Sequence, residues 1–272
     1  MRDRYMAYPL SVSPIFRLED NGRSPSPVQQ QRAYLYRMNT SPGLLAGDSL
    51  AMSIRLDAGS SLYLADQAAT KVHTMPVAGI DKATSASVRY HIEVGEAATL
   101  EFLPEPLILF GESALKQTTE ITLYPTAGLC WGEIILPGRL SRAEHYQFRE
   151  CFSRIQLATP DGRICFVEAM KLLGKENRFA QSALFASAPV LGSLILVLPE
   201  AGTMADALAR LSHRIEALAT DSLSLACTVL PGERGLFVRA IAATTRAMQA
   251  GFKGAVDEVR SLRNQAPLPY SL

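Results

Sequence analysis

The feature that most constrains the fold is a loose repeat in the first half of the chain. Each copy has a strand-like run, a turn of small residues, a second strand-like run and then an acidic residue. The copies are IRLDAGSSLYLAD (54–66), HIEVGEAATLEFLPE (91–105) and ITLYPTAGLCWGE (121–133). Leu62, Leu100 and Leu129 occupy the equivalent place. A hairpin cannot bury its apolar face alone, so we expect each copy to stack on the next.

The repeat predicts a mainly β fold of stacked β-sheets with a β-helix-like body. We expect stacked hairpins over residues 34–175, where short strand-like runs are bounded by Gly or Pro. Uneven spacing between the copies argues against a strict solenoid array. The polar stretch before this region, residues 20–31, contains two prolines and predicts a surface loop or a partly disordered excursion.

The C-terminal third predicts strands plus two α-helices over residues 190–265. The first helix follows a capping-box-like start at Thr203, and its apolar stripe consists of Met204, Leu208, Leu211, Ile215 and Leu218. The second runs from about Thr244 to Arg263 and contains Gly251 and Gly254. Each glycine weakens a helix by roughly 1 kcal/mol relative to alanine, so tertiary packing must hold it. We treat residues 1–272 as a single domain.

Composition excludes several classes of protein. The net charge is +1, so no polyanionic partner is indicated and nucleic acid is not favoured. No run approaches the roughly 18 apolar residues of a membrane span, and the N-terminus lacks a signal-peptide pattern, so we expect a cytoplasmic protein. The cysteines lie far apart, without a C-x-x-C pair, and are predicted to be free core thiols. They are Cys130, Cys151, Cys165 and Cys227.

The stretch SPGLLAGDSL (41–50) raises an esterase alternative, because its last four residues spell a serine-esterase signature around Ser49. A serine nucleophile needs a base and an acid that orients the base. That esterase family supplies both from an Asp-x-x-His near the C-terminus. None of the four histidines here has aspartate three residues before it; they are His73, His91, His145 and His213. The esterase alternative is weakened and stays open.

The same stretch has the glycine spacing of a phosphate loop between Gly43 and Gly47. A phosphate loop continues with Gly-Lys-Ser/Thr, whereas Asp48 follows here and would repel phosphates. We therefore expect Gly43 and Gly47 to serve a backbone turn, with Asp48 either closing that turn or exposed for another purpose.

The spacing of His and Cys indicates no tight metal-binding site, since the chain has no H-x-H, H-x-x-x-H or C-x-x-C. It does have acids at predicted strand ends: Asp48, Asp66, Glu105, Glu133, Glu144 and Glu168. Each alone is typical of a solvated strand end. Together they could line a water-filled passage that holds a divalent cation weakly. The polar run DQAATKVH (66–73) is either a strand leaving the sheet or the wall of such a passage.

The ordered set of motifs resembles the urease accessory proteins called UreD, or UreH in some bacteria. SPGLLAGDSL followed by DQAATKVH carries the resemblance most strongly. The other carriers, in order, are LEFLPEPLILF (100–110), LPGRL (136–140) with Glu144 just after, PDGRICFVEAMKL (160–172) and LPGERGLFVRAI (230–241). The resemblance covers nearly all of the chain.

The resemblance implies a non-enzymatic scaffold with a large β-helical fold and a few helices. Such proteins bind apo-urease together with UreF and UreG, the latter a GTPase, and deliver nickel to the urease active site. A water-filled passage is proposed to carry the ion. The resemblance thus implies that nickel(II) binds only in transit and that no cofactor is tightly bound. It is also compatible with a homodimer of this chain within the complex.

We therefore assign candidate residues to a transient nickel path: Asp48, Asp66, His73, Glu133 and Glu168. The candidates for the local turn and the passage wall are Gly43, Gly47, Gln67, Thr70 and Lys71. Besides the esterase, one further alternative remains, a β-rich interaction module with no metal role.

Overall fold

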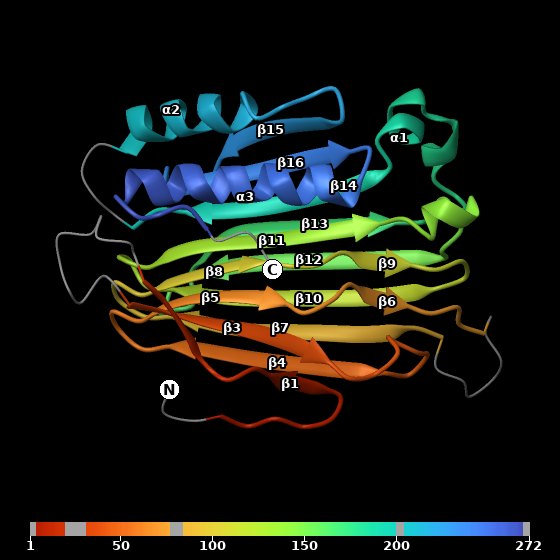
Figure 1. Cartoon of the computed structure of the whole chain (residues 1–272), viewed down its shortest axis with the longest axis horizontal. Helices are drawn as coiled ribbons and strands as arrows, with labels where there is room; N and C mark the ends of the chain where they lie inside the picture. The colour runs from red at the N-terminus through yellow and green to blue at the C-terminus, as the bar shows by residue number, and fades with distance from the viewer. Residues whose placement is uncertain (1–3, 20–30, 77–83, 200–203, 269–272) are drawn as a thin grey trace.

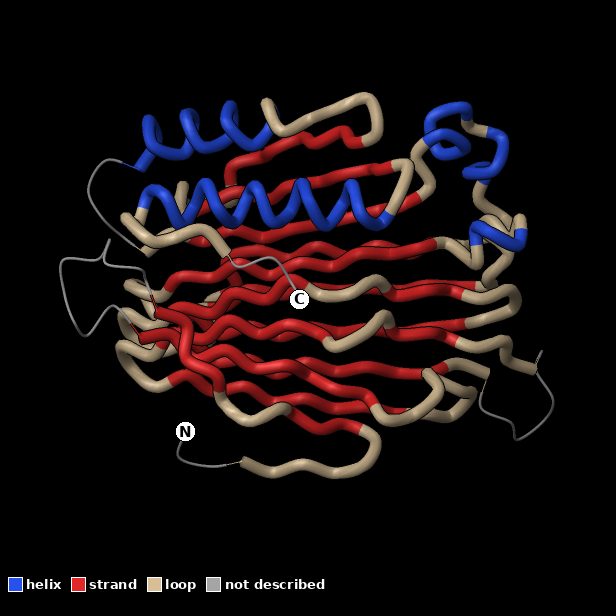
Figure 2. The backbone as a smooth tube through the Cα atoms, viewed as in Figure 1, coloured by secondary structure: helices blue, strands red, loops and turns tan. Residues whose placement is uncertain are grey.

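Two stacked β-sheets form the body of the protein in a computed structural model, which describes residues 4–19, 31–76, 84–199 and 204–268 (Figure 1). Sheet A has 11 strands and sheet B has 5. The main path of sheet A runs β1-β3-β5-β8-β11-β14-β16-β15, and sheet B runs β13-β12-β10-β7-β4. The helices gather at the end of the stack formed by the C-terminal third (Figure 2). This arrangement confirms the predicted mainly β fold class.

The strands of sheet A are β1 (Leu10–Val12), β2 (Phe16–Glu19), β3 (Gln31–Asn39), β5 (Ser61–Asp66), β6 (Thr70–Val72), β8 (Thr99–Leu103), β9 (Leu107–Leu109), β11 (Gly128–Leu136), β14 (Val190–Val197), β15 (Leu223–Val229) and β16 (Gly235–Ala242). Those of sheet B are β4 (Ser49–Leu56), β7 (Ala86–Val94), β10 (Ala114–Leu123), β12 (Glu150–Ala158) and β13 (Ile164–Leu172). The α-helices are α1 (Ala183–Ser187), α2 (Met204–Glu216) and α3 (Thr245–Leu262). Short 3-10 helices lie at Leu140–Arg142 and Arg178–Gln181.

The three repeat copies are arches between the sheets, so the prediction of hairpins is wrong for them. In each copy the first strand (β4, β7 or β10) lies in sheet B and the second (β5, β8 or β11) lies in sheet A. Successive copies pair in parallel within each sheet. An arch lets both strands bury apolar side chains against each other across the sandwich. The predicted stacking of copies is confirmed, and an antiparallel hairpin occurs later, at β12–β13.

The strands of sheet A break at a common level. β5 ends at Asp66 before β6 resumes at Thr70, and β8 ends at Leu103 before β9 resumes at Leu107. The continuous strand β11 pairs with β8 on one side of the break and with β9 on the other. Glu133 lies on β11 between those two paired stretches. The acid that ends the repeat therefore falls where the backbone ladder is interrupted.

Two apolar cores follow from the two faces of sheet A. The larger core lies between the sheets, and the smaller lies between sheet A and helices α2 and α3. Sheet B shows the alternation expected of a half-buried sheet: in β7, Val88 and Ile92 face inward while Arg89 and His91 are exposed. A polar side chain on an inward-facing position of sheet B is therefore an exception that needs an explanation.

The C-terminal elements match their predicted positions. Strands β14, β15 and β16 flank α2, and α3 begins after Thr244, whose hydroxyl accepts a hydrogen bond from the Ala247 amide (3.1 Å). A Cβ added to Gly251 would lie 2.4 Å from Leu223, so the helix glycines permit close packing, as expected. The predicted cap at Thr203 and residues 20–30 of the predicted loop at 20–31 lie outside the described residues, and Gln31 already begins β3.

The cysteines are free thiols. Cys130 and Cys151 are buried as predicted, whereas Cys165 and Cys227 are half-buried, so the core prediction is wrong for those two. They lie on β13 and β15, which end sheets B and A at the same edge of the sandwich. Within the described residues, no helix is long and apolar enough to cross a membrane.

Candidate functional site

A row of polar side chains crosses the otherwise apolar space between the sheets. In sheet A the register pairs Arg37 with Asp66, and further along it pairs Glu133 with Ser193 and Ser193 with Arg239. Sheet B contributes side chains that contact members of this set. We call the whole set the polar row: Arg37, Asp66, Tyr90, Gln117, Glu133, Ser153, Glu168, Ser193 and Arg239.

One end of the polar row is an ion pair. Arg37 donates to both oxygens of Asp66, with Nε to Oδ1 at 2.6 Å and Nη2 to Oδ2 at 2.8 Å, and its Nη1 donates to the Tyr90 hydroxyl on sheet B. Burial raises the pKa of Asp66, and the Arg37 charge opposes that rise. We take the pair as ionised because a short two-point contact of this kind favours both charges. Asp66 is therefore neutralised within the protein.

The middle of the polar row is Glu133, which is only 6% exposed. Its Oε2 accepts hydrogen bonds from Gln117 Nε2 (3.2 Å) and Ser153 Oγ (2.7 Å), both on sheet B. Its Oε1 is buried and has no hydrogen-bond partner. Burial raises the pKa of Glu133, opposed by the Ser153 and Gln117 hydrogen bonds and by the charge of Arg239. Within the described residues no ion pair satisfies this carboxylate.

The other end of the polar row lies at the edge of the sandwich, where β13 faces β16. Arg239 Nη2 contacts Glu168 Oε1, and Arg239 Nη1 lies 3.6 Å from the Met170 sulfur. The two charged side chains are 40% and 31% exposed. Unlike the first two sites, this ion pair therefore meets solvent.

Asp48 and His73 lie apart from the polar row. Asp48 Oδ2 accepts a hydrogen bond from the Leu45 amide (2.8 Å), which closes the turn before β4. His73 Nε2 lies 3.1 Å from the Pro42 carbonyl, and its ring stands edge-on to Phe110. Both side chains therefore help to hold the turn at residues 42–48.

The residues predicted for the turn and the passage wall also lie in different surroundings. Gly43 has φ +146°, and a Cβ there would lie 2.5 Å from the Lys71 carbonyl oxygen, so only glycine fits. Gly47 also has a positive φ of +88°. Gln67 and Lys71 are exposed. Thr70 lines a small interior cavity of about 20 Å³ beside Arg37, Tyr90 and Gln117, enough for about one water molecule.

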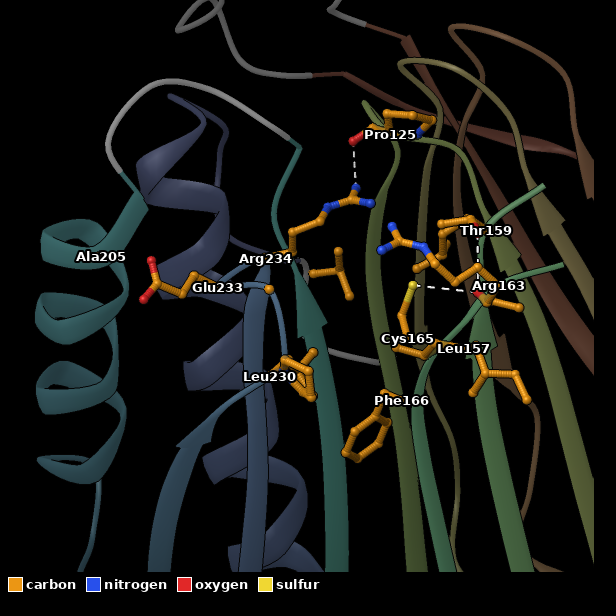
Figure 3. A pocket seen from close by; sticks show the side chains of 16 residues that line it. Pro125, Leu157, Thr159, Arg163, Cys165, Phe166, Ala205, Leu230, Glu233 and Arg234 are labelled. Carbon is orange, nitrogen blue, oxygen red and sulfur yellow. Dashed lines mark hydrogen bonds between the residues drawn. The ribbon is translucent and has the colours of Figure 1, made fainter. Parts of the chain in front are cut away.

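Larger cavities lie near both ends of the polar row. Asp66 borders a cavity of about 350 Å³ between sheet A and α3, together with Glu105 and Gln249. A cavity of about 930 Å³ lies between the turn after β12 and the turn after β15 (Figure 3). Phe166 on β13 lines it and also a neighbouring groove of about 510 Å³. No predicted site residue lines the 930 Å³ cavity, so volume alone does not locate the site.

The arrangement does not resemble a resident metal centre. In the parts of the chain that the structure describes, no three His, Cys, Asp or Glu side chains gather to hold an ion. Carboxylates are instead spaced singly along the polar row. Such single oxygen ligands bind a transition-metal ion weakly, because these ions prefer imidazole or thiolate when tight binding is required.

Sequence reasoning missed the partners of the acids, although one signal was available. Gln117 and Ser153 occupy inward-facing positions of alternating strands, between apolar neighbours such as Leu115 and Ile155. Polar side chains in an apolar period-2 face indicate a buried polar contact. Arg37 and Arg239 gave no comparable signal, since their partners Asp66 and Glu168 are 29 and 71 residues away.

The geometry around Ser49 differs from that of a serine nucleophile. Ser49 is exposed at the start of β4, and its Oγ accepts a hydrogen bond from Arg89 Nη2 (3.3 Å). A nucleophilic serine is activated by a base that takes its proton, and a guanidinium cannot do so.

The fold and the polar row together define a mainly β protein with single carboxylates buried between its two sheets. The sequence matches the family model described as UreD urease accessory protein over residues 1–271. It is 43% identical over 267 residues to the urease accessory protein UreD of Trichodesmium erythraeum, covering 98% of this chain and 91% of that protein. UreD 2 of Streptomyces griseus is 29% identical over 247 residues, covering 89% and 80%.

The chain therefore belongs to the UreD urease accessory protein family. It is a non-catalytic accessory protein that takes part in urease maturation. This finding confirms the resemblance seen in the sequence and the prediction that the protein is not an enzyme. The esterase alternative on Ser49 is wrong.

Proposed function

We propose that the protein serves urease maturation by passing nickel(II) along the polar row. Glu133 carries this proposal. Its carboxylate is buried and, among the described residues, one of its oxygens has no hydrogen-bond partner and the other accepts hydrogen bonds only from neutral groups. A buried carboxylate without a counter-charge is unfavourable unless it binds a proton or a cation. A nickel ion in transit is such a cation, and weak oxygen ligation allows its release.

The proposed route has two ends. One end is the cavity beneath α3, which Asp66 and Glu105 line, and from there the route passes Arg37 and the small cavity beside Tyr90 to Glu133. The other end is Glu168 on the open edge of the sandwich. Asp48 and His73 lie outside this route, in the turn that precedes β4.

We further propose that UreF, UreG and apo-urease are the partners of this chain, in the cytoplasm, and that a homodimer forms within their complex. Family membership supports this part of the proposal, because partners of these types follow from the resemblance. Nickel would enter and leave the polar row across the interfaces with these partners.

The test is Glu133→Gln, expressed together with urease and its accessory proteins. Glutamine keeps the shape and the acceptor oxygen for Gln117 and Ser153 but loses the charge. We expect nickel per urease active site to fall on the order of tenfold, the scale seen when groups near a metal are lost. The matched control is Glu120→Gln, a 60% exposed carboxylate on the outer face of sheet B.

Asp66→Ala is a poor test, because it leaves the buried Arg37 charge without its carboxylate and so threatens folding. Full nickel content with a folded Glu133→Gln variant would overturn the proposal. That outcome, with partner binding retained, would favour the alternative of a β-rich interaction module without a metal role.

A further inference from the structure

We infer that Arg239 controls the access of divalent cations to Glu133 from the open edge of the sandwich, with Glu168 as its releasable counter-ion. The inference rests on the proposed nickel route and adds a selectivity residue to it. It assigns a role to an arginine that the passage of a cation would otherwise leave unexplained.

The first observation is position. Glu133, Ser193 and Arg239 are register partners on the successive strands β11, β14 and β16. The residue between the carboxylate and the guanidinium in this row is thus a serine. Ser153, which contacts Glu133 from sheet B, is also small. A cation that leaves Glu133 toward the edge of the sandwich therefore meets Arg239 next.

The second observation is how the edge is closed. Phe166 on β13 and Phe237 on β16 pack with ring centroids 5.3 Å apart, two residues along each strand from the ion pair. Both rings line the outer groove of about 510 Å³. Aromatic carbon blocks an ion on that side. The Glu168–Arg239 contact lies beside this aromatic pair and is a partly exposed polar contact between β13 and β16.

The third observation is the electrostatic reach of the pair. The Arg239 charge lowers the pKa of Glu133 and the Glu168 charge raises it, so both groups act on the buried carboxylate. While the two remain paired, their effects oppose each other. An unpaired Arg239 would repel a cation from Glu133, and an unpaired Glu168 would attract one.

The pair is suited to opening because it is partly solvated. Exposed ion pairs contribute little to stability, so separating this one requires little free energy. A divalent cation at the edge can take the Glu168 carboxylate, and Arg239 can then turn toward water. A monovalent cation competes less well with a guanidinium for a carboxylate, so the pair also favours divalent ions.

The experiment follows nickel incorporation into apo-urease by the assembled complex at limiting nickel, for Arg239→Gln, Glu168→Gln and the double variant. We expect Arg239→Gln to raise the rate at least about threefold and Glu168→Gln to lower it by a similar factor, which is the scale of an exposed charge pair. The double variant should lie between them. Arg55→Gln, from the exposed pair with Glu93, is the matched control.

The two single variants separate this inference from a structural role. A pair that only holds the edge together would give the same loss for both singles, and that result would overturn the inference. Glu133→Gln is measured in parallel. If Glu133→Gln slows nickel incorporation while the Arg239 and Glu168 variants match the control, the nickel route stands and the role of Arg239 is rejected. If Glu133→Gln incorporates nickel at the wild-type rate, the route itself fails.

Discussion

Glu101 and Glu133 are buried carboxylates on neighbouring strands of sheet A, and their surroundings are opposite. Glu101 on β8 faces α3 and is 1% exposed, with its Oε2 2.6 Å from Arg260 Nη1 and its Oε1 3.4 Å from Arg32 Nη1. Glu133 on β11 faces sheet B, where neutral donors alone contact it. Among the residues that the structure describes, two guanidiniums thus contact the first carboxylate and none contacts the second.

The difference teaches that burial of an acid does not by itself indicate function. Glu101 is fixed in place by its charges, and Arg260 also donates its Nε to the Ala266 carbonyl (2.6 Å), which ties the segment after α3 to the sheet. Its role is structural. Glu133 is similarly buried but has no counter-charge among the described residues, so its ionised form is a potential cation ligand. The two carboxylates therefore differ in their counter-charges and not in their burial.

The largest expected effect on stability comes from Glu101→Gln. Removing this charge leaves the buried Arg260 guanidinium without its carboxylate, so we expect the free energy of unfolding to fall by about 3–5 kcal/mol. Denaturant unfolding measures it. As a control, Glu93→Gln removes an acid whose pair with Arg55 is 31% and 73% exposed, and should change stability by less than about 1 kcal/mol. Equal losses would show that the buried network is not structural.

Asp66→Asn should have an intermediate effect. Arg37 loses its charged partner but keeps the hydrogen bond to Tyr90, so we expect a loss of about 2–3 kcal/mol in the free energy of unfolding. The same denaturant series measures it. A loss as small as that of Glu93→Gln would place Asp66 with Glu133, as an acid that the fold does not need.

Glu133→Gln should change the free energy of unfolding by no more than about 1 kcal/mol at neutral pH, because glutamine keeps the hydrogen bonds and removes a poorly paired charge. Thermal and denaturant unfolding of the purified protein measure it. A loss as large as that of Glu101→Gln would mean that Glu133 has a structural role, and the comparison between the two acids would collapse.

The smallest expected effect is on the pH dependence of the free energy of unfolding, to which Glu133 and Glu144 should contribute with opposite signs. Burial raises the pKa of Glu133 above its ordinary 4.5, so the folded state binds more protons than the unfolded state in that range. Wild type should therefore lose stability relative to Glu133→Gln as the pH rises above 4.5, until the folded pKa is passed. The free-energy difference between the two proteins, measured across pH, gives the sign.

Glu144 supplies the contrast. Hydrogen bonds from Arg139 lower its pKa to about 2, so its contribution to stability is present above the ordinary 4.5 and is lost as the pH falls toward 2. Wild type should lose stability relative to Glu144→Gln in that acidic range. A difference of the same sign at both acids would contradict the assigned environments.

The sequence located the acids well and their partners poorly. The repeat placed Asp66 and Glu133 at equivalent ends, and the structure puts both at the break in sheet A. The hairpin interpretation failed because alternation with period 2 is the same in an arch and in a hairpin, so the pattern does not say which sheet a strand joins. Arg37 and Arg260 could not be predicted, because their partners are 29 and 159 residues away.

The most direct measurement is anomalous diffraction at the nickel edge, from crystals of wild type and of Glu133→Gln grown with nickel(II). We expect nickel bonded to Glu133 Oε1 in wild type, none there in the variant, and none at Glu101, which already has two guanidiniums. Nickel at other positions with Glu133 unoccupied in wild type, or equal nickel density beside residue 133 in both proteins, would contradict it.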